Sequence, residues 1–245
     1  MQPRIIYLES VDSTNSYLSE ICMDGKIKEE LAVVADYQEF GRGQAKRRWV
    51  SDPGENLLMS ILLFPAFLSA SRVFHLSRVC SLAVHDLLHG LGVASSIKWP
   101  NDILTGRGKI TGMLIENGIT GDRVSRTIMG IGLNVNQEIF PPFPVPATSL
   151  LTETGKVHRP REVAVQMVEA VMARYLQLQQ GETGKLERDY LDRMYLLGLR
   201  ARFRAGGGEF TGTIRGVSQS GELLLERGGK LLTFGFGQVS YLDPK

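Results

Sequence analysis

A short glycine- and arginine-rich segment, GRGQAKRRW at residues 41–49, has the residue types that bind an anion. Glycine permits positive φ and lets backbone N–H groups converge on an anion, as in a phosphate nest. Arg42 and Arg47 add bidentate, charge-assisted hydrogen bonds, and Trp49 offers a flat face. A flexible basic hairpin explains the same residues equally well, so this segment alone leaves both interpretations open.

The segment KWPNDILTGRGKITGMLIEN, residues 98–117, gathers charged residues around one predicted turn. Lys98 and Asp102 end one strand and Lys109 opens the next, and a purely structural hairpin needs none of these charges. Gly112 inside the second strand indicates close approach of a ligand or of another backbone. The pattern therefore favours a functional site over a structural hairpin.

Two further segments supply polar or glycine residues. DSTN, residues 12–15, is typical of a helix N-cap, which explains it when taken alone. The hydroxyls and free N–H groups of such a helix start also form a polar socket for a small ligand. GIGLNVN, residues 130–136, thins a strand with glycine and presents the amide of Asn134, but alone it does not define a site.

The hydrophobic pattern predicts the elements that position these residues. Strands are predicted at residues 4–9, 31–36, 56–64, 95–99, 109–117 and 126–135. Helices are predicted from Ser13 or Thr14 to Gly25, at residues 71–90, and from Pro160 to the glutamines before Gly181. Residues 138–150 hold four prolines and predict an irregular surface segment. After residue 197, short β-like runs separated by GGG, SQSG and RGG predict a small antiparallel barrel, which divides the chain into residues 1–196 and 197–245.

The composition is that of a soluble globular protein, with 43% hydrophobic and 22% charged residues. A net charge of +2 is too small to indicate electrostatic capture of duplex nucleic acid by the whole protein, although local basic clusters can still bind an anion. The sequence contains neither a signal peptide nor an apolar run that spans a bilayer, which predicts a cytoplasmic protein without a membrane partner. Cys22 and Cys80 are expected to be buried thiols. His85 and His89 have metal-like spacing but no third ligand, so no side-chain metal site is predicted.

Together the segments DSTN, GRG…RRW, KWPND…GKITGMLIE and GIGLNVN resemble, in this order, the catalytic core of the biotin protein ligases. The resemblance implies an α+β fold in which helices cover a mixed sheet, similar to class II aminoacyl-tRNA synthetases, followed by a small C-terminal SH3-like β-barrel. It implies activation of biotin with ATP and Mg²⁺ to biotinoyl-5′-AMP. The biotinoyl group is then expected to pass to a lysine of a biotin carboxyl carrier protein or domain.

The resemblance also assigns roles by motif position. Lys109, Arg42 and Asp102 correspond to catalytic residues, with Lys109 at the reacting phosphate and Asp102 near the incoming lysine. The implied biotin-binding set is Ser13, Thr14, Asn15, Gln38, Gly41, Arg42, Gly43, Gln44, Lys109, Gly112, Leu114 and Gly132. The implied ATP- and adenylate-binding set is Arg42, Arg47, Trp49, Lys109 and Asn134.

Two departures from the family pattern carry expectations of their own. Many members read GRGR-x-GR-x-W, whereas this chain has Gln44, Ala45 and Lys46 between Gly43 and Arg47. Gln44 supplies no charge, which predicts weaker retention of the adenylate unless Lys46 compensates. The chain starts almost directly at the catalytic core, without a helix-turn-helix, which predicts a ligase that does not bind DNA. Monomer and homodimer both remain open.

Two alternative functions are set against this one. A lipoate- or octanoate-transferring relative would carry a loop of the type R-R-x-S-G-G-G, and the chain has no counterpart. A non-catalytic biotin sensor would lack the adenylation residues, yet Arg42, Lys109 and Asp102 are all present. A protein-interaction module is disfavoured because the motif residues converge on a site and not on an apolar patch.

Overall fold

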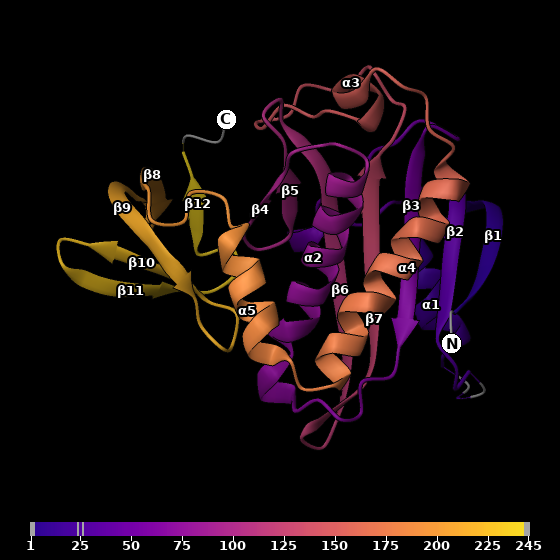
Figure 1. The fold of residues 1–245 in the computed structure, drawn as a ribbon, viewed down its shortest axis with the longest axis horizontal. Helices are drawn as coiled ribbons and strands as arrows, with labels where there is room; N and C mark the ends of the chain where they lie inside the picture. The colour runs from indigo at the N-terminus through magenta and orange to yellow at the C-terminus, as the bar shows by residue number, and fades with distance from the viewer. Residues whose placement is uncertain (1–2, 24, 26, 243–245) are drawn as a thin grey trace.

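The main element of the computed structural model, which describes residues 3–23, 25 and 27–242, is a mixed sheet. Within these residues seven strands lie in the order β1-β2-β3-β7-β6-β5-β4 (Figure 1). Their bounds are β1 Arg4–Val11, β2 Leu31–Gln38, β3 Asn56–Leu63, β4 Ser96–Lys98, β5 Asp102–Leu104, β6 Lys109–Thr120 and β7 Arg123–Asn134. Strands β1 and β2 are parallel, and the other neighbours are antiparallel. The sheet is therefore mixed, as the sequence predicted.

Helices cover the two faces of this sheet unequally. Figure 1 shows α2 (Phe74–Gly90) and α4 (Pro160–Gln179) on one face, beside α5 (Thr183–Asp192), and α1 (Thr14–Ile21) behind the sheet. Strand β3 is buried over its whole length because its alternate residues serve both faces. Leu57 and Met59 belong to the large core with α2 and α4, whereas Leu62 packs with Leu18 of α1.

A second, antiparallel sheet follows in the order β11-β10-β9-β8-β12. Its strands are β8 Arg200–Ala205, β9 Gly208–Val217, β10 Leu223–Arg227, β11 Lys230–Phe234 and β12 Val239–Tyr241. Several glycines of the predicted GGG and RGG turns have positive φ, which glycine adopts without steric cost: Gly206, Gly207, Gly228 and Gly229. Buried residues of this sheet, such as Phe203 and Leu225, belong to the same hydrophobic cluster as the main core.

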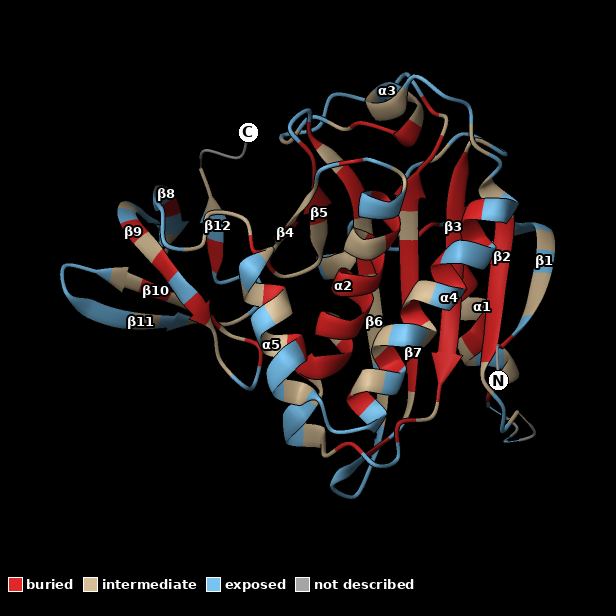
Figure 2. Cartoon of the chain, viewed as in Figure 1, coloured by how far each residue is buried: buried red, intermediate tan, exposed pale blue. Residues whose placement is uncertain are grey.

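The tryptophan of the KWPND motif anchors the second sheet to the first. The Trp99 side chain is buried, and its Nε1 donates a hydrogen bond of 2.8 Å to the carbonyl of Gly221. Its ring centroid lies 5.4 Å from that of Phe236. Figure 2 shows that burial is continuous across the central strands and α2 and becomes patchy toward the C-terminal sheet. Trp99 is thus a packing residue between the two sheets.

A second tie between the sheets starts from Arg78 of α2, whose Nη2 donates a hydrogen bond of 3.4 Å to the carbonyl of Ser218, just after β9. Arg78 lies 3.3 Å from Glu187 of α5, and both Arg78 and His75 are almost inaccessible to solvent. Burial, together with the neighbouring charges of Arg78 and Arg72, lowers the pKa of His75 to about 4. His75 is therefore neutral near pH 7 and belongs to the packing of the junction.

The structure differs from the predicted elements in three places. A short strand, β5, lies between β4 and β6 where the sequence predicted one turn, because three residues are too few to show a hydrophobic period. The proline-rich segment is not wholly irregular, since Ala147 forms a β-bridge with Lys109 and helix α3 (Leu150–Thr154) follows. Ser13 stands at the N-cap of α1, but its side chain makes no capping hydrogen bond.

Two short 3-10 helices, η1 (Gln44–Lys46) and η2 (Ala70–Arg72), lie between the strands and helices of the described residues. The second replaces the first turn of the helix that the sequence predicted at residues 71–90. Across the part of the chain that the structure describes, no helix is both long enough and apolar enough to cross a membrane.

Candidate functional site

Glycines form the floor of a site on the face of the sheet that α1 covers. Gly132 of β7 pairs with Leu58 on one side and with Gly112 of β6 on the other. Gly112 in turn pairs with Asp102 of β5, and Asp102 pairs with Lys98 of β4. Directly paired residues of antiparallel strands point to the same face, so this row leads from the glycines to the two charged side chains. The register of the strands therefore places the KWPND, KITGM and GIGLN motifs side by side in the sheet.

The indole of Trp49 lies directly on this floor. A Cβ atom at Gly132 would lie 2.5 Å from Trp49 Cε2, and one at Gly112 would lie 2.9 Å from Trp49 Cζ3. Real Cβ atoms do not approach so closely, so both positions require glycine. The sequence predicted close approach of a ligand or of another backbone at Gly112, and in the structure a side chain, the indole of Trp49, makes this approach. The loop after β2 and the floor thus form one site.

One end of the floor is rich in positive charge, and we call it the reacting end: Lys98, Asp102, Lys109 and the neighbouring Arg47. Lys109 Nζ lies 2.6 Å from Asp102 Oδ1, and Lys98 Nζ lies 3.9 Å from Asp102 Oδ2. Burial lowers the pKa of Lys98; Asp102 opposes this shift, whereas the charges of Lys109 and Arg47 add to it. Three cations near one carboxylate leave net positive charge, which suits a phosphate.

The other end is a network of hydroxyl and amide groups, and we call it the ring end. The amide N–H of Thr14 donates to Gln38 Oε1 at 2.7 Å, and Thr14 Oγ1 lies 2.7 Å from Ser60 Oγ. Ser60 Oγ donates to Asn15 Oδ1 at 2.6 Å, and Asn15 Nδ2 donates to the carbonyl of Leu114 at 3.2 Å. Ser13, Thr14 and Asn15 are all buried. The DSTN segment thus contributes to one buried polar network with Gln38 and Ser60, and its role as a socket for a ligand stays a prediction.

Arg42 closes over the ring end. Its Nη2 lies 2.6 Å from Glu116 Oε1, and its Nη1 lies 3.2 Å from Glu116 Oε2, which also accepts a 2.7 Å hydrogen bond from Asn15 Nδ2. Glu116 and Lys109 stand on the same strand about 20 Å apart at ~3.3 Å per residue. The structure therefore brings Lys109 and Asp102 together and places Arg42 at the opposite end.

The glycines of the loop serve close approach and not a positive φ. Gly43 has φ −126°, and the positive φ in this loop belongs to Ala45, at 53°. A Cβ atom at Gly41 would lie 2.5 Å from the carbonyl oxygen of Trp49, whose N–H donates to the carbonyl of Gly41 at 2.9 Å. Of the two interpretations that the sequence left open, these glycines do not supply the positive φ of a nest, and the loop folds back on itself through the bridge between Arg42 and Arg48.

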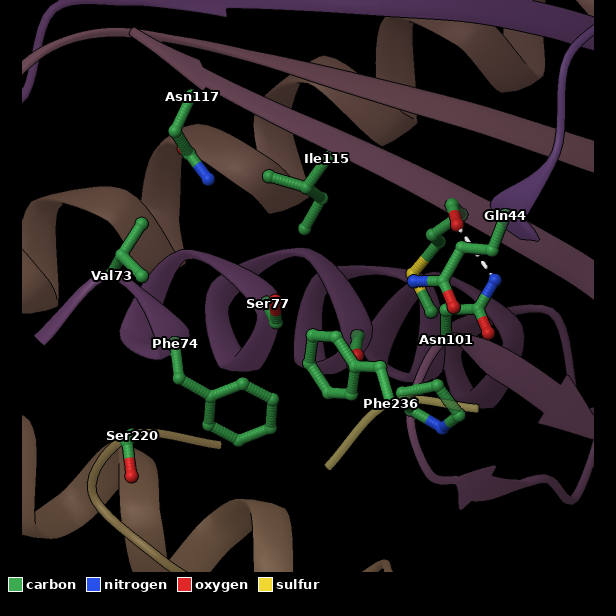
Figure 3. A pocket seen from close by; sticks show the side chains of 12 residues that line it. Gln44, Val73, Phe74, Ser77, Asn101, Ile115, Asn117, Ser220 and Phe236 are labelled. Carbon is green, nitrogen blue, oxygen red and sulfur yellow. Dashed lines mark hydrogen bonds between the residues drawn. The ribbon is translucent and has the colours of Figure 1, made fainter. Parts of the chain in front are cut away.

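Gln44 faces a cavity whose lining includes none of the residues named at the two ends of the site. This cavity has a volume of about 90 Å³ and is also lined by Asn101, Phe74 of α2 and Phe236 of the second sheet (Figure 3). The structure therefore does not bring Gln44 to the residues of the biotin-binding set around Thr14. The side chain of Lys46 lies outside the described residues, so its compensation for Gln44 stays a prediction.

Two buried polar atoms of the site have no hydrogen-bond partner within the described part of the protein. These atoms are Trp49 Nε1 and Asn134 Oδ1. The other amide atom of Asn134, Nδ2, donates to the carbonyl of Thr148 at 2.9 Å. Burying a polar group without a partner costs roughly 1–3 kcal/mol, so both atoms indicate where a ligand with polar groups binds.

Sequence reasoning missed several residues of the site. Ser60 joins Thr14 to Asn15, and its position as a polar residue within the run LLMSILLF was a usable signal. Glu116 stood inside a motif but received no role. Gly130 was part of the glycine pattern of GIGLNVN but received no role, although a Cβ atom there would collide with Asn15. Among the residues described, no group of three His, Cys, Asp or Glu side chains is placed to hold a metal ion.

Comparison with known proteins defines the family. The sequence profile of the biotin/lipoate A/B protein ligase family matches residues 7–134, which carry most of the site. The chain is 31% identical over 225 residues to the biotin--[acetyl-CoA-carboxylase] ligase of Paracoccus denitrificans, covering 89% of this chain and 92% of that protein. It is 32% identical over 245 residues to the bifunctional ligase/repressor BirA of Bacillus subtilis (strain 168), covering 92% and 70%. The chain belongs to the biotin/lipoate A/B protein ligase family.

A solved structure agrees with this placement. The biotin protein ligase of Aquifex aeolicus, in complex with biotin and ATP, superposes with a TM-score of 0.80 at 29% identity and covers 97% of each chain. The fold therefore extends the likeness beyond the matched residues to the second sheet.

Proposed function

We propose that this protein is a biotin–protein ligase that activates biotin with ATP and transfers the biotinoyl group to a lysine of a biotin carboxyl carrier protein or domain. The observation that carries the proposal is the glycine floor, which joins a neutral hydrogen-bonding socket to a cationic end within one site. The named activity of the Paracoccus denitrificans relative and the ligands of the Aquifex aeolicus structure support it.

In the first step a carboxylate oxygen of biotin attacks the α-phosphorus of ATP, which enters as its magnesium complex. The bond from that phosphorus to the bridging oxygen breaks, and pyrophosphate leaves. Such a reaction needs positioning and charge neutralisation more than a protein nucleophile. Lys109 and Arg47 supply this positive charge, and Asn134 and Trp49 offer their unpartnered polar atoms on the nucleotide side of the site.

In the second step the amine of the acceptor lysine attacks the acyl carbon of biotinoyl-5′-AMP. The bond between that carbon and the phosphate oxygen breaks, which forms the amide and releases AMP. Asp102 is placed to orient the amine and to take its proton, because its carboxylate is partly exposed and lies at the end of the glycine floor. Its bond to Lys109 keeps this carboxylate in place.

The ring end recognises the bicyclic head of biotin in this proposal. Thr14, Asn15 and Gln38 offer both donors and acceptors, which match a cyclic urea. Gly112 and Gly132 leave space beneath the valeryl chain. Arg42 holds the loop over this end through Glu116, and Gly41 and Gly43 let the loop fold tightly.

We also infer that the second sheet is the SH3-like domain of the family and that it begins at residue 197. The support is the change of sheet at that point, where Leu197 forms a β-bridge with Ile214 ahead of β8. Its contact with Trp99 then links it to the KWPND motif.

The test is pyrophosphate release from ATP with biotin, lipoate or octanoate offered separately and no acceptor present. Release with biotin alone, followed by transfer to a biotin carboxyl carrier domain, is the expected result. Release of pyrophosphate only with lipoate or octanoate would instead indicate a lipoate- or octanoate-transferring enzyme. Biotin binding without pyrophosphate release would make it a sensor.

A further inference from the structure

Glu153 of α3 lies outside every motif of the site, yet its carboxylate joins two segments that border the reacting end. Its Oε1 accepts hydrogen bonds from Thr105 Oγ1 at 2.7 Å and from Thr148 Oγ1 at 2.8 Å. The Glu153 side chain is only 13% exposed. Thr105 precedes the turn between β5 and β6, whereas Thr148 lies near the end of the proline-rich segment. One largely buried oxygen therefore cross-links two loops that are distant in the sequence.

The segment around Thr148 bonds the backbone of Lys109 directly, and the turn after Thr105 bonds that of its neighbour Gly108. The N–H of Lys109 donates to the carbonyl of Pro146 at 2.7 Å, and its carbonyl accepts from the N–H of Thr148 at 3.0 Å. On the side of the turn, the N–H of Thr105 donates to the carbonyl of Gly108 at 2.8 Å. A Cβ atom at Gly108 would collide with the carbonyl of Pro146, so the two loops are in close contact. The position of Lys109 depends on how these loops meet.

The same cross-link reaches Asn134. The carbonyl of Thr148 accepts a 2.9 Å hydrogen bond from Asn134 Nδ2, which turns the unpartnered Asn134 Oδ1 to its position in the site. Within the part of the chain that the structure describes, the hydrogen bonds that join Thr14, Asn15 and Gln38 at the ring end involve neither Glu153 nor its two threonines. Glu153 is therefore connected to the reacting end and not to the ring end.

We propose that Glu153 is a positioning residue for the adenylation step, acting through Thr105 and Thr148 to hold Lys109 and Asn134. It touches neither substrate. Hydrogen bonds to an ionised carboxylate are roughly twice as strong as neutral ones, so one such group can fix two loops. A displacement of about 1 Å in a reacting group can cost ~100-fold in rate. This proposal rests on the function proposed above.

The experiment compares Glu153→Ala and Glu153→Gln with the wild type in biotin-dependent exchange of pyrophosphate into ATP, with kcat and KM measured for both substrates. Removing the carboxylate is expected to lower kcat by about 10- to 100-fold because Lys109 loses its fixed position. Biotin affinity, measured by calorimetry, is expected to stay within about twofold because the ring end is untouched. The glutamine variant keeps an acceptor oxygen for both threonines, so its kcat should return to within about threefold of the wild type.

Thr154→Val is the matched control, since Thr154 stands on the same helix and donates to the carbonyl of Leu150, away from Lys109. It should lose some thermal stability without losing kcat. If Glu153→Ala folds poorly, Thr148→Val and Thr105→Val each remove one of the two bonds and are expected to lower kcat in the same direction.

Equal kcat in the wild type and Glu153→Ala would overturn the proposal. So would a parallel loss of biotin affinity, or a glutamine variant as slow as the alanine variant. A wild type that exchanges no pyrophosphate would instead refute the proposed function, so the two failures are distinguishable.

Discussion

The two ends of the site differ in how their charges are balanced. At the ring end Arg42 is neutralised by Glu116, and the hydroxyl and amide groups of Thr14 and Asn15 already have partners. At the reacting end Lys98, Lys109 and Arg47 surround a single carboxylate, Asp102. Neutral, paired groups suit recognition of an uncharged ring, whereas unbalanced positive charge suits a reacting phosphate.

This difference separates affinity from rate. An interaction that is the same in the ground state and the transition state changes binding, and one that strengthens in the transition state changes the rate. The ring end should therefore control how tightly biotin binds, and the reacting end should control how fast it is activated. The mutations below test that separation.

The largest expected effect comes from Lys109→Ala. Loss of its charge should lower the rate of adenylate formation by at least about 100-fold, because that charge matters most as the phosphate reacts. Biotin affinity should change by no more than roughly threefold, since the ring end is untouched. The measurement is pyrophosphate release beside calorimetric titration with biotin. An unchanged rate of release would contradict the assignment of the reacting end.

Gly112→Val should act on binding. A Cβ atom there would lie 2.9 Å from Trp49 Cζ3 and 3.1 Å from Lys109 Nζ. A valine side chain would therefore displace the Trp49 indole and occupy the space above the glycine floor. We expect biotin affinity to fall by about 10- to 100-fold through steric exclusion. Gly118→Val is the matched control on β6, because its nearest neighbour is the flexible side chain of Arg126. Normal affinity in Gly112→Val would refute the placement of the biotin pocket.

Glu116→Ala should shorten the time for which biotin stays bound. It removes the 2.6 Å ion pair with Arg42 and frees the loop over the ring end. Both side chains are accessible to solvent, so the ion pair contributes only about 1 kcal/mol. Its loss should make biotin dissociate about three- to tenfold faster. The rate of biotin activation should change little. Stopped-flow release of biotin measures this. Glu209→Ala, which breaks a pair of the same 2.6 Å length with Arg204 in the second sheet, should leave release unchanged.

Gln44→Arg should have the smallest effect. Restoring the family's arginine adds a charge to the loop, but Gln44 faces the cavity beside Asn101 and not the ring end. We expect dissociation of biotinoyl-5′-AMP to slow by roughly two- to fivefold, as one partly exposed cation contributes little. Release of labelled intermediate from the isolated complex gives the rate. Equal rates in the two proteins would show that Gln44 does not weaken retention.

Local sequence was sufficient for the elements with a clear period and for the motifs themselves. Strands β2, β3 and β6 and helix α4 were predicted close to their bounds because alternation or helical spacing runs through them. Strand β5, with three residues, and α3, with five, were missed because such short elements carry no period and form only when neighbouring strands or loops support them.

The sequence by itself determined the family, the mixed sheet and the types of chemistry at each end of the site. Only the tertiary structure decided which residues meet. Strand register places Gly132, Gly112 and Asp102 in one row, and loop packing sends Arg42 to Glu116 and Gln44 to a separate cavity. Motifs record which side chains are present, but register and loop contacts are non-local, so they depend on pairings between residues far apart in the chain.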